Sequence, residues 1–247
     1  KEDSSEFFRN LSEKLKQKYT SKALAIPVLP DKVNMNLFID KIDNLNNVPI
    51  GVYKDTLDIC LFDFKKNFLN KITASEIENT TSFIKELLSI FNTVTKFKTY
   101  LLDPDSAILE NYSNITKYTT NFDSLLSGTN DSLNKIYEEL NESNFDALSI
   151  ARYQPMLLVI YGFDSLKSKV TTEFGEILSN LNNIKEKTGL VNIIVVDSID
   201  NFKKYEFESW FKTINLADHA IWIGEGINNQ FSIKLTRSSD RALRTPL

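Results

Sequence analysis

The sequence is poor in the residues that build disulfide frameworks, metal centres and phosphate-binding loops. Its 247 residues include one cysteine, one histidine, 7 glycines and 6 prolines. A single cysteine excludes an internal disulfide and a cysteine-based zinc site, and a single histidine, His219, excludes a histidine-rich metal centre. Because phosphate-binding loops depend on glycine, the low glycine count also weighs against nucleotide binding.

Strong positive charge and long apolar segments are missing as well. The net charge is −4, whereas a nucleic-acid surface needs clustered Lys and Arg, so we expect no nucleic-acid partner. No apolar run approaches the roughly 20 residues of a membrane span. Residues 1–5 are charged or polar and no signal-peptide core follows them. We therefore interpret the sequence as a soluble piece of a longer protein.

Apolar periodicity predicts strands that alternate with helices. Apolar side chains at helical spacing predict helices at 6–19, 77–91, 133–140 and 174–184, with a shorter one at 34–42. Continuous or alternating apolar runs predict strands at 48–53, 58–64, 68–72, 97–102, 156–161, 191–196, 220–223 and 231–235. This order predicts an α/β fold with a mostly parallel sheet and helices on both faces. We expect one domain over 1–247, with residues 1–50 as a helical and extended segment packed on its core.

Four stretches of the sequence together carry a family resemblance. They are Ala25–Pro30 with Val48–Asp55, then Phe68–Phe91, Leu157–Asp164, and Ala220–Phe231. Their order and spacing resemble the ATPase domains of FtsK/SpoIIIE-type translocases. The last stretch, Ala-Ile-Trp-Ile-Gly-Glu-Gly-Ile-Asn-Asn-Gln-Phe, is most similar to the last ATPase domain of EssC-like coupling proteins of type VII secretion. The resemblance implies a RecA-like P-loop NTPase fold.

The stretch that matches the phosphate loop of this family departs from its pattern. A working loop reads Gly-x-x-x-x-Gly-Lys-Ser/Thr, but here Thr73 and Glu78 stand at the glycine positions and Asn79 at the lysine position, while Thr80 keeps its type. A Cβ at a glycine position keeps backbone N–H groups from wrapping around phosphate. Asn79 brings no positive charge, and Glu76 and Glu78 bring the wrong one. We interpret residues 73–80 as a vestigial phosphate loop.

The second nucleotide motif of the family, at the end of the strand 157–161, is also altered. The family places an Mg²⁺-ordering Asp and a neighbouring Glu there, whereas this strand ends in Tyr161 and Gly162. We interpret Asp164, which follows, as the N-cap of the next helix. With loop, lysine, metal ligand and base all altered, the resemblance implies a pseudo-ATPase domain with no catalytic residue, no cofactor and no metal.

Several isolated residues have both a functional and a structural interpretation. Asp197 and Asp200 follow a buried strand, where active sites of α/β proteins lie, but we favour a turn and a helix cap. His219 is a candidate general base and Cys60 a candidate nucleophile, and for both we favour a structural role.

The aromatic residues near the C-terminal end also have both a functional and a structural interpretation. Trp222 and Phe231 are candidates for a peptide-docking wall, although we favour core packing. Trp210 and Phe211 lie in a short segment rich in aromatic and charged residues, and core and interface are equally compatible with it. They are the candidates for substrate docking.

From the resemblance we expect a non-hydrolysing docking and regulatory domain of a membrane-anchored secretion ATPase, on the cytoplasmic side of the membrane. The implied partners are secreted helical-hairpin substrates, accessory proteins of the secretion system and other ATPase domains of the same chain, with a homo-oligomeric ring in the full-length protein. The alternative is a nucleotide-binding or weakly active ATPase domain of the same translocase.

Overall fold

The structure of the chain is a computed structural model that describes residues 4–18, 42, 44–53, 56–169, 174–214 and 220–227. The proximity of Cα atoms divides the chain into two compact units. The first comprises Lys1–Val33 with Val52–Ile59, and the second comprises Asn34–Gly51 with Cys60–Leu247. The predicted helix at 34–42 and the predicted strand at 231–235 fall on residues outside the described ranges, apart from residue 42.

The first unit contains the predicted N-terminal helix, which is confirmed as α1 (Ser4–Lys18). Phe7, Phe8, Leu11 and Leu15 of this helix are exposed. The Tyr53 N–H donates to the Asp58 carbonyl oxygen at 2.8 Å. In the described part of the chain, no helix is both long and apolar enough to span a membrane.

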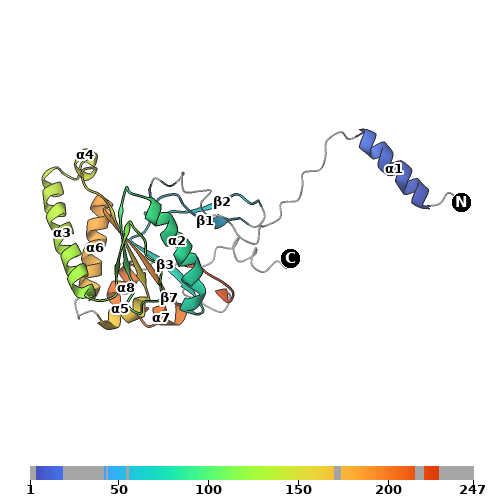
Figure 1. Cartoon of the computed structure of the whole chain (residues 1–247). Coiled ribbons are helices and arrows are strands. Elements are labelled where there is room, and N and C mark those ends of the chain that lie inside the picture. The colour runs from blue at the N-terminus through green and yellow to red at the C-terminus, as the bar shows by residue number, and fades with distance from the viewer. Residues whose placement is uncertain are drawn as a thin grey trace. The chain divides into compact units, whose positions relative to one another are not determined.

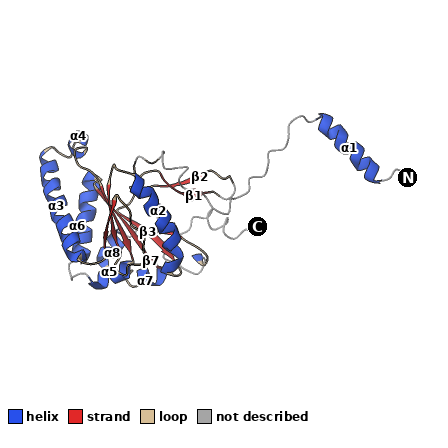
Figure 2. Cartoon of the chain, in the orientation of Figure 1, coloured by secondary structure: helices blue, strands red, loops and turns tan. Residues whose placement is uncertain are grey.

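The second unit is built on a six-stranded sheet whose pairings are all parallel, in the order β5-β4-β6-β7-β3-β8. Its strands, drawn in red in Figure 2, are β3 (Leu69–Ala74), β4 (Lys98–Leu102), β5 (Ile115–Tyr118), β6 (Met156–Tyr161), β7 (Val191–Ser198) and β8 (Ala220–Trp222). Two further strands, β1 (Val48–Val52) and β2 (Ile59–Phe62), form a separate two-stranded sheet. The prediction of a mostly parallel sheet is confirmed.

Helices cover both faces of this sheet (Figure 1). One face carries α2 (Thr81–Thr93), which follows the short 3₁₀ helix η2 (Ile77–Thr80). The other face carries α3 (Phe122–Glu142), α5 (Phe163–Lys169), α6 (Phe174–Thr188), α7 (Ile199–Lys203) and α8 (Ser209–Ile214). The short helix α4 (Ala147–Ile150) follows α3. The sheet is thus the middle layer of three, as its apolar strands require.

The side chains of each central strand alternate between the two cores. On β6, Leu157 and Val159 pack in the cluster that contains α2, whereas Leu158 and Ile160 pack in the cluster that contains α6. Because both faces are covered, nearly every residue of β6 and β7 is buried, which explains their continuous apolar sequences. Leu45 and Val48 are also buried in the α2 cluster, while the packing of residues 1–50 as a whole on the core stays a prediction.

Sequence periodicity located most elements but not all of their bounds. The helix predicted at 133–140 extends over Phe122–Glu142, and the polar stretch 111–120 contains β5. The short helices α4, α7 and α8 have too few turns for a periodic signal, and α7 and α8 are held by tertiary contacts of Phe202 and Phe211.

Candidate functional site

The carboxyl ends of parallel strands meet at one edge of a sheet, and ligands of α/β proteins bind at such an edge. Here β3, β7 and β6 are neighbours in the sheet, in that order. Their carboxyl ends bring the predicted vestigial phosphate loop, Asp197 and Tyr161 to the same edge. The residue pairs Thr73–Asp197 and Tyr161–Val196 fix this register.

The junction after β3 is short and regular. Thr73 and Ala74 still belong to the strand, and only Ser75 and Glu76 separate it from η2, which begins at Ile77. The Asn79 N–H donates to the Glu76 carbonyl oxygen at 3.2 Å, so this backbone donor is used within the helical turn. Glu76, like Glu78 and Asn79, is exposed. No glycine lies between Gly51 and Gly128, and the backbone has no position free of a Cβ here.

Thr80, the one residue of the loop motif that keeps its type, is buried and locally engaged. Its hydroxyl donates to the Ile77 carbonyl oxygen at 2.6 Å. The Thr81 N–H donates to the Glu78 carbonyl oxygen. The hydroxyl and the neighbouring backbone donor therefore stabilise the first turns of η2 and α2 rather than facing an open site.

Tyr161 connects the end of β6 to the junction after β3. Its ring is buried, its hydroxyl lies 2.7 Å from the Thr81 Oγ1, and it donates to the Ile77 carbonyl oxygen at 3.2 Å. Since β7 lies between β6 and β3, the Tyr161 side chain spans the edge of the sheet. A phenol thus occupies the place where the family pattern has an acidic metal ligand.

The loop after β8 covers the same junction from the other side. The Ser75 hydroxyl donates to the Glu225 carbonyl oxygen at 3.4 Å. Gly226 has a φ of +91°, and a Cβ on it would lie 2.9 Å from the Ser75 Oγ, so glycine is required for this close approach. The Trp222 Nε1–H donates to the Gly224 carbonyl oxygen at 3.0 Å, which ties this indole to its own loop.

Asp197, at the end of β7, is a buried structural carboxylate. Its Oδ2 accepts a bond from the Asp164 N–H at 2.8 Å, and its Oδ1 accepts bonds from the Ser198 N–H at 2.7 Å and the Asn201 Nδ2 at 2.6 Å. Burial raises the pKa of Asp197, against the lowering effect of these hydrogen bonds. Three donors therefore occupy this carboxylate.

The prediction that Asp164 is the N-cap of the next helix is wrong. Helix α5 begins at Phe163, so Asp164 lies in its first turn and the Asp197 carboxylate accepts its N–H. The Asp164 carboxylate instead accepts bonds from the Lys204 Nζ at 2.7 Å and from the Tyr205 hydroxyl. The acceptor at the start of α5 is Asp197 of β7, which is distant in the sequence, so the residues next to α5 give no signal of it.

Asp200 does not form a carboxylate pair with Asp197. It is exposed and lies 2.7 Å from the Lys203 Nζ, in the first turn of α7. The N-cap of α7 is Ser198, so Asp200 lies in the first turn of the helix and, contrary to expectation, does not cap it. Among the described residues, no group of three or more His, Cys, Asp and Glu side chains could hold a metal ion.

The aromatic docking candidates are placed in the core rather than in an open groove. Phe211 is 1% exposed and stacks on Phe202 at 6.4 Å between ring centroids. Trp210 is partly buried and covers Gly175, where an added Cβ would lie 2.7 Å from the indole. The exposed ring of this segment is Phe207, at 86% exposure. The sequence drew attention to this segment as a docking candidate because of its aromatic content. Phe211 is nevertheless a core residue, because α8 packs against α6 and α7.

The other isolated candidates do not form a reactive cluster in the described ranges. Cys60 is half-buried on β2. His219 and Phe231 lie outside the described residues, so their predicted structural roles stay predictions.

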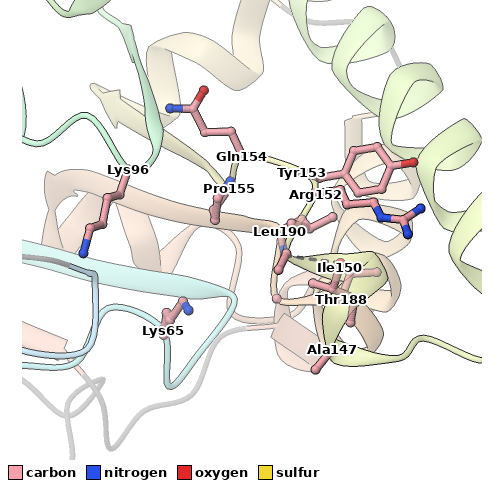
Figure 3. A pocket seen from close by; sticks show the side chains of 12 residues that line it. Lys65, Lys96, Ala147, Ile150, Arg152, Tyr153, Gln154, Pro155, Thr188 and Leu190 are labelled. Carbon is pink, nitrogen blue, oxygen red and sulfur yellow. Dashed lines mark hydrogen bonds between the residues drawn. The ribbon is translucent and has the colours of Figure 1, made fainter.

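A pocket of about 620 Å³ lies at the opposite, amino edge of the sheet. Figure 3 shows its lining, with Lys65 and Lys96 on one side and Arg152 and Tyr153 on the other. Its residues come from the loops before β3, β4, β6 and β7 and from α4. Sequence reasoning missed this site, because its cations are scattered over the chain and form no motif.

The fold and the arrangement of its edge define the class of protein. A parallel sheet of order β4-β6-β7-β3-β8, with a helix directly after β3, is a RecA-like α/β fold of the P-loop ATPase type. The predicted fold class is therefore confirmed. The sequence matches no family model and no curated protein.

Solved structures of type VII secretion ATPases share this fold. The cytoplasmic domain of EssC matches with a TM-score of 0.65 and 18% identity, over 96% of this chain and 49% of that chain. EssC (ATPases 2 and 3) from Geobacillus thermodenitrificans matches with 0.63 and 19%, over 96% and 46%. EccC (ATPases 2 and 3) from Thermomonospora curvata, in complex with a signal sequence peptide, matches with 0.51 and 12%, over 83% and 39%. The chain thus spans about half the length of the two EssC structures, and the expected similarity to EssC-like ATPase domains is confirmed at the level of the fold.

Proposed function

We propose that this chain is a non-hydrolysing docking and regulatory domain of a type VII secretion ATPase. The closed junction after β3 is the observation that carries this proposal. A polyphosphate placed there would meet no lysine and no glycine cradle, but two exposed carboxylates, Glu76 and Glu78. A like-charge contact near 4 Å costs roughly 4 kcal/mol at an effective dielectric of 20. Tyr161 and the loop at Gly224 and Gly226 occupy the space beside it.

The proposed partners follow from the resemblance and from the similar structures. Two of those structures hold ATPases 2 and 3, and one of these two holds a signal sequence peptide. For this chain we propose secreted helical-hairpin substrates or accessory proteins as ligands, other ATPase domains of the same parent protein as neighbours, and a homo-oligomeric ring in that parent. The parent would be anchored in the membrane with this part on the cytoplasmic side. Residues 1–247 would form one degenerate ATPase domain.

Two assays on the purified chain test this role. We expect no Mg-ATP turnover above the buffer blank, and saturable binding when helical-hairpin secretion proteins and accessory proteins of the same secretion system are titrated in. ATP turnover by the chain would support the alternative, a weakly active ATPase domain. If no secretion protein binds, alone or beside the neighbouring ATPase domain, the docking role is overturned.

A further inference from the structure

Helix α1 (Ser4–Lys18) has an apolar face that no described residue of the core covers. Its four apolar side chains, Phe7, Phe8, Leu11 and Leu15, are between 41% and 66% exposed. None of them belongs to either buried core cluster of the described chain. A helix of 15 residues is only marginally stable in water when tertiary packing does not support it. We therefore expect this face to lie against a surface that the described residues do not supply.

These four side chains form one narrow band, which we call the apolar stripe. Successive residues are about 100° apart around a helix axis, so the stripe occupies about 100° of the circumference of α1. The Phe7 and Phe8 rings meet edge to face, with 5.7 Å between their centroids. The stripe extends over about two heptads, whereas a coiled coil needs three to four. A coiled-coil partner is therefore not its expected occupant.

The cations of α1 border the apolar stripe on both sides, and we call them the basic borders. Lys14 and Lys18 lie on the Phe7 side, about two and three turns further along the helix. Arg9 and Lys16 lie beyond the other border, and Lys16 lines the same hollow as three residues of the stripe. Two copies of α1 packed stripe to stripe would bring like charges together, so a second copy is a disfavoured occupant.

The two carboxylates of α1 lie opposite the stripe. Glu6 and Glu13 are about two turns apart, in the middle of the polar face. The helix therefore separates its charges by sign, with positive charge beside the apolar stripe and negative charge farthest from it. With four cations and two carboxylates, α1 is a basic helix in a chain of net charge −4. The positive charge is thus a local property of α1.

This arrangement is complementary to the surface of an anionic lipid membrane. An amphipathic helix at such a surface buries its apolar side at the boundary of headgroups and acyl chains, and its cations contact anionic lipids. Long Lys and Arg side chains beside the apolar side reach the phosphates while their apolar stems stay near the lipid. Carboxylates on the opposite side stay in water, where screening weakens their repulsion by the lipid. A protein groove requires no such separation of the two signs.

We propose that α1 binds the surface of an anionic lipid membrane and lies in its plane. The apolar stripe enters the boundary between headgroups and acyl chains, the basic borders contact lipid phosphates, and Glu6 and Glu13 face the water. The inference goes beyond the proposed docking role and does not depend on it, because α1 contributes to neither core cluster of the described chain.

Vesicle flotation of the full chain tests this proposal. Wild type is compared with Phe8→Ser/Leu15→Ser, which interrupts the apolar stripe, and with Leu109→Ser/Leu148→Ser, a control that removes two exposed leucines outside α1. The vesicles contain phosphatidylglycerol and phosphatidylcholine in equal amounts, or phosphatidylcholine alone. Hydrogen exchange over residues 4–18 measures whether α1 itself is protected, and urea unfolding establishes that every variant folds.

A further variant separates the position of the charges from the net charge. Glu13→Lys/Lys16→Glu exchanges a carboxylate and a cation, so the composition and net charge stay the same while a negative charge moves to the border of the stripe. We expect it to bind anionic vesicles about tenfold more weakly than wild type. Equal binding would mean that the net charge alone acts, which contradicts the proposed arrangement.

We expect wild type and the leucine control to float with anionic vesicles, with slowed exchange over residues 4–18, and the stripe variant to bind about tenfold more weakly. The proposal is overturned if wild type does not bind anionic vesicles, if it binds phosphatidylcholine alone equally well, or if the stripe variant binds as tightly. Protection of residues 4–18 before vesicles are added would show a protein surface on this face and overturn it as well. Its failure is distinct from that of the proposed function, because secretion proteins can bind elsewhere on a chain that binds no lipid.

Discussion

The two edges of the sheet use their polar groups in opposite ways. At the carboxyl edge, Asp197 accepts three hydrogen bonds, Tyr161 is bonded to the junction after β3, and Thr80 is bonded within its own turn. At the amino edge, Lys65 and Arg152 line an open pocket and form no ion pair with a described carboxylate. In α/β proteins the carboxyl edge normally binds the ligand, whereas in this chain the polar groups of that edge are bonded to one another.

The difference shows how a fold can be kept while its usual site is closed. The core around strand β3 does not depend on a glycine-rich loop, because Ile72 and Leu69 pack on the two sides of the sheet. The groups at the carboxyl edge are instead the junction of Ser75 and Glu76, the tyrosine at the end of β6 and the loop after β8. Fold and site are thus separable properties of the sequence.

The largest expected effect concerns Lys71, a buried cation of β3 that contrasts with the accessible cations of the pocket. Its side chain is 1% exposed, and its Nζ lies 5.7 Å from the centroid of the Phe202 ring. Burial lowers its pKa from 10.5 to about 8, partly offset by attraction to Glu206. Since the folded pKa is the lower one, Lys71 destabilises the fold near pH 7, and this penalty is relieved as pH rises from about 8 towards 10.5.

We therefore expect Lys71→Met to change the pH dependence of stability. The wild type should gain about 2.5 kcal/mol relative to the variant between about pH 7 and about pH 10, which is most of the penalty set by the lowered pKa at 1.36 kcal/mol per unit. Urea unfolding at both pH values measures this. The matched control, Lys135→Met on the exposed surface of α3, should follow the wild type. If the stability of Lys71→Met depends on pH in the same way as that of the wild type, burial does not lower the pKa of Lys71.

A smaller difference in the free energy of unfolding is expected between variants of Tyr161, at the carboxyl edge, and Tyr153, at the amino edge. Tyr161→Phe removes the hydroxyl that bonds to Thr81 and Ile77, and a buried hydrogen bond contributes about 1 kcal/mol. We expect Tyr161→Phe to lower the free energy of unfolding by about 1 kcal/mol. Tyr153→Phe, which removes a solvent-exposed contact to Glu139 at the amino edge, should cost less. An equal loss for the two variants would mean that the carboxyl edge is no more tightly held than the amino edge.

The smallest expected effect is on the stability of the pocket itself. Lys65→Ala and Arg152→Ala remove charges that pair with no described carboxylate, so we expect each to leave the free energy of unfolding within about 0.5 kcal/mol of wild type. Thermal and urea unfolding measure this. A loss well above that range would assign these cations a structural role.

Much of the fold could be predicted from the sequence, because its signal is local. The apolar runs at 156–161 and 191–196 predicted the central strands, and the helical stripe at 77–91 predicted the helix after β3. The sequence also predicts an altered phosphate loop from the absence of glycine and lysine at 73–80, and this stays a prediction. The hydrogen bond between Tyr161 and Thr81 was not, because it joins residues eighty positions apart.

The site at the amino edge could not be predicted for the same reason. Lys65, Arg152 and Leu190 come from distant segments that only the sheet topology brings together. Likewise, nothing local indicates that Phe211 is buried and Phe207 exposed, since that choice depends on how α8 packs against α6. Local chemistry was predictable, and long-range placement required the fold.

Isothermal titration of the chain with Mg-ATP tests the central claim, that the carboxyl edge is closed to nucleotide, most directly. The chain should give no heat of binding up to millimolar Mg-ATP, because the junction after β3 offers neither a lysine nor a ring of free N–H groups. A saturable isotherm with a micromolar dissociation constant, weakened by Thr80→Val or by Tyr161→Ala, would contradict the account, because it would require a working nucleotide site at this edge.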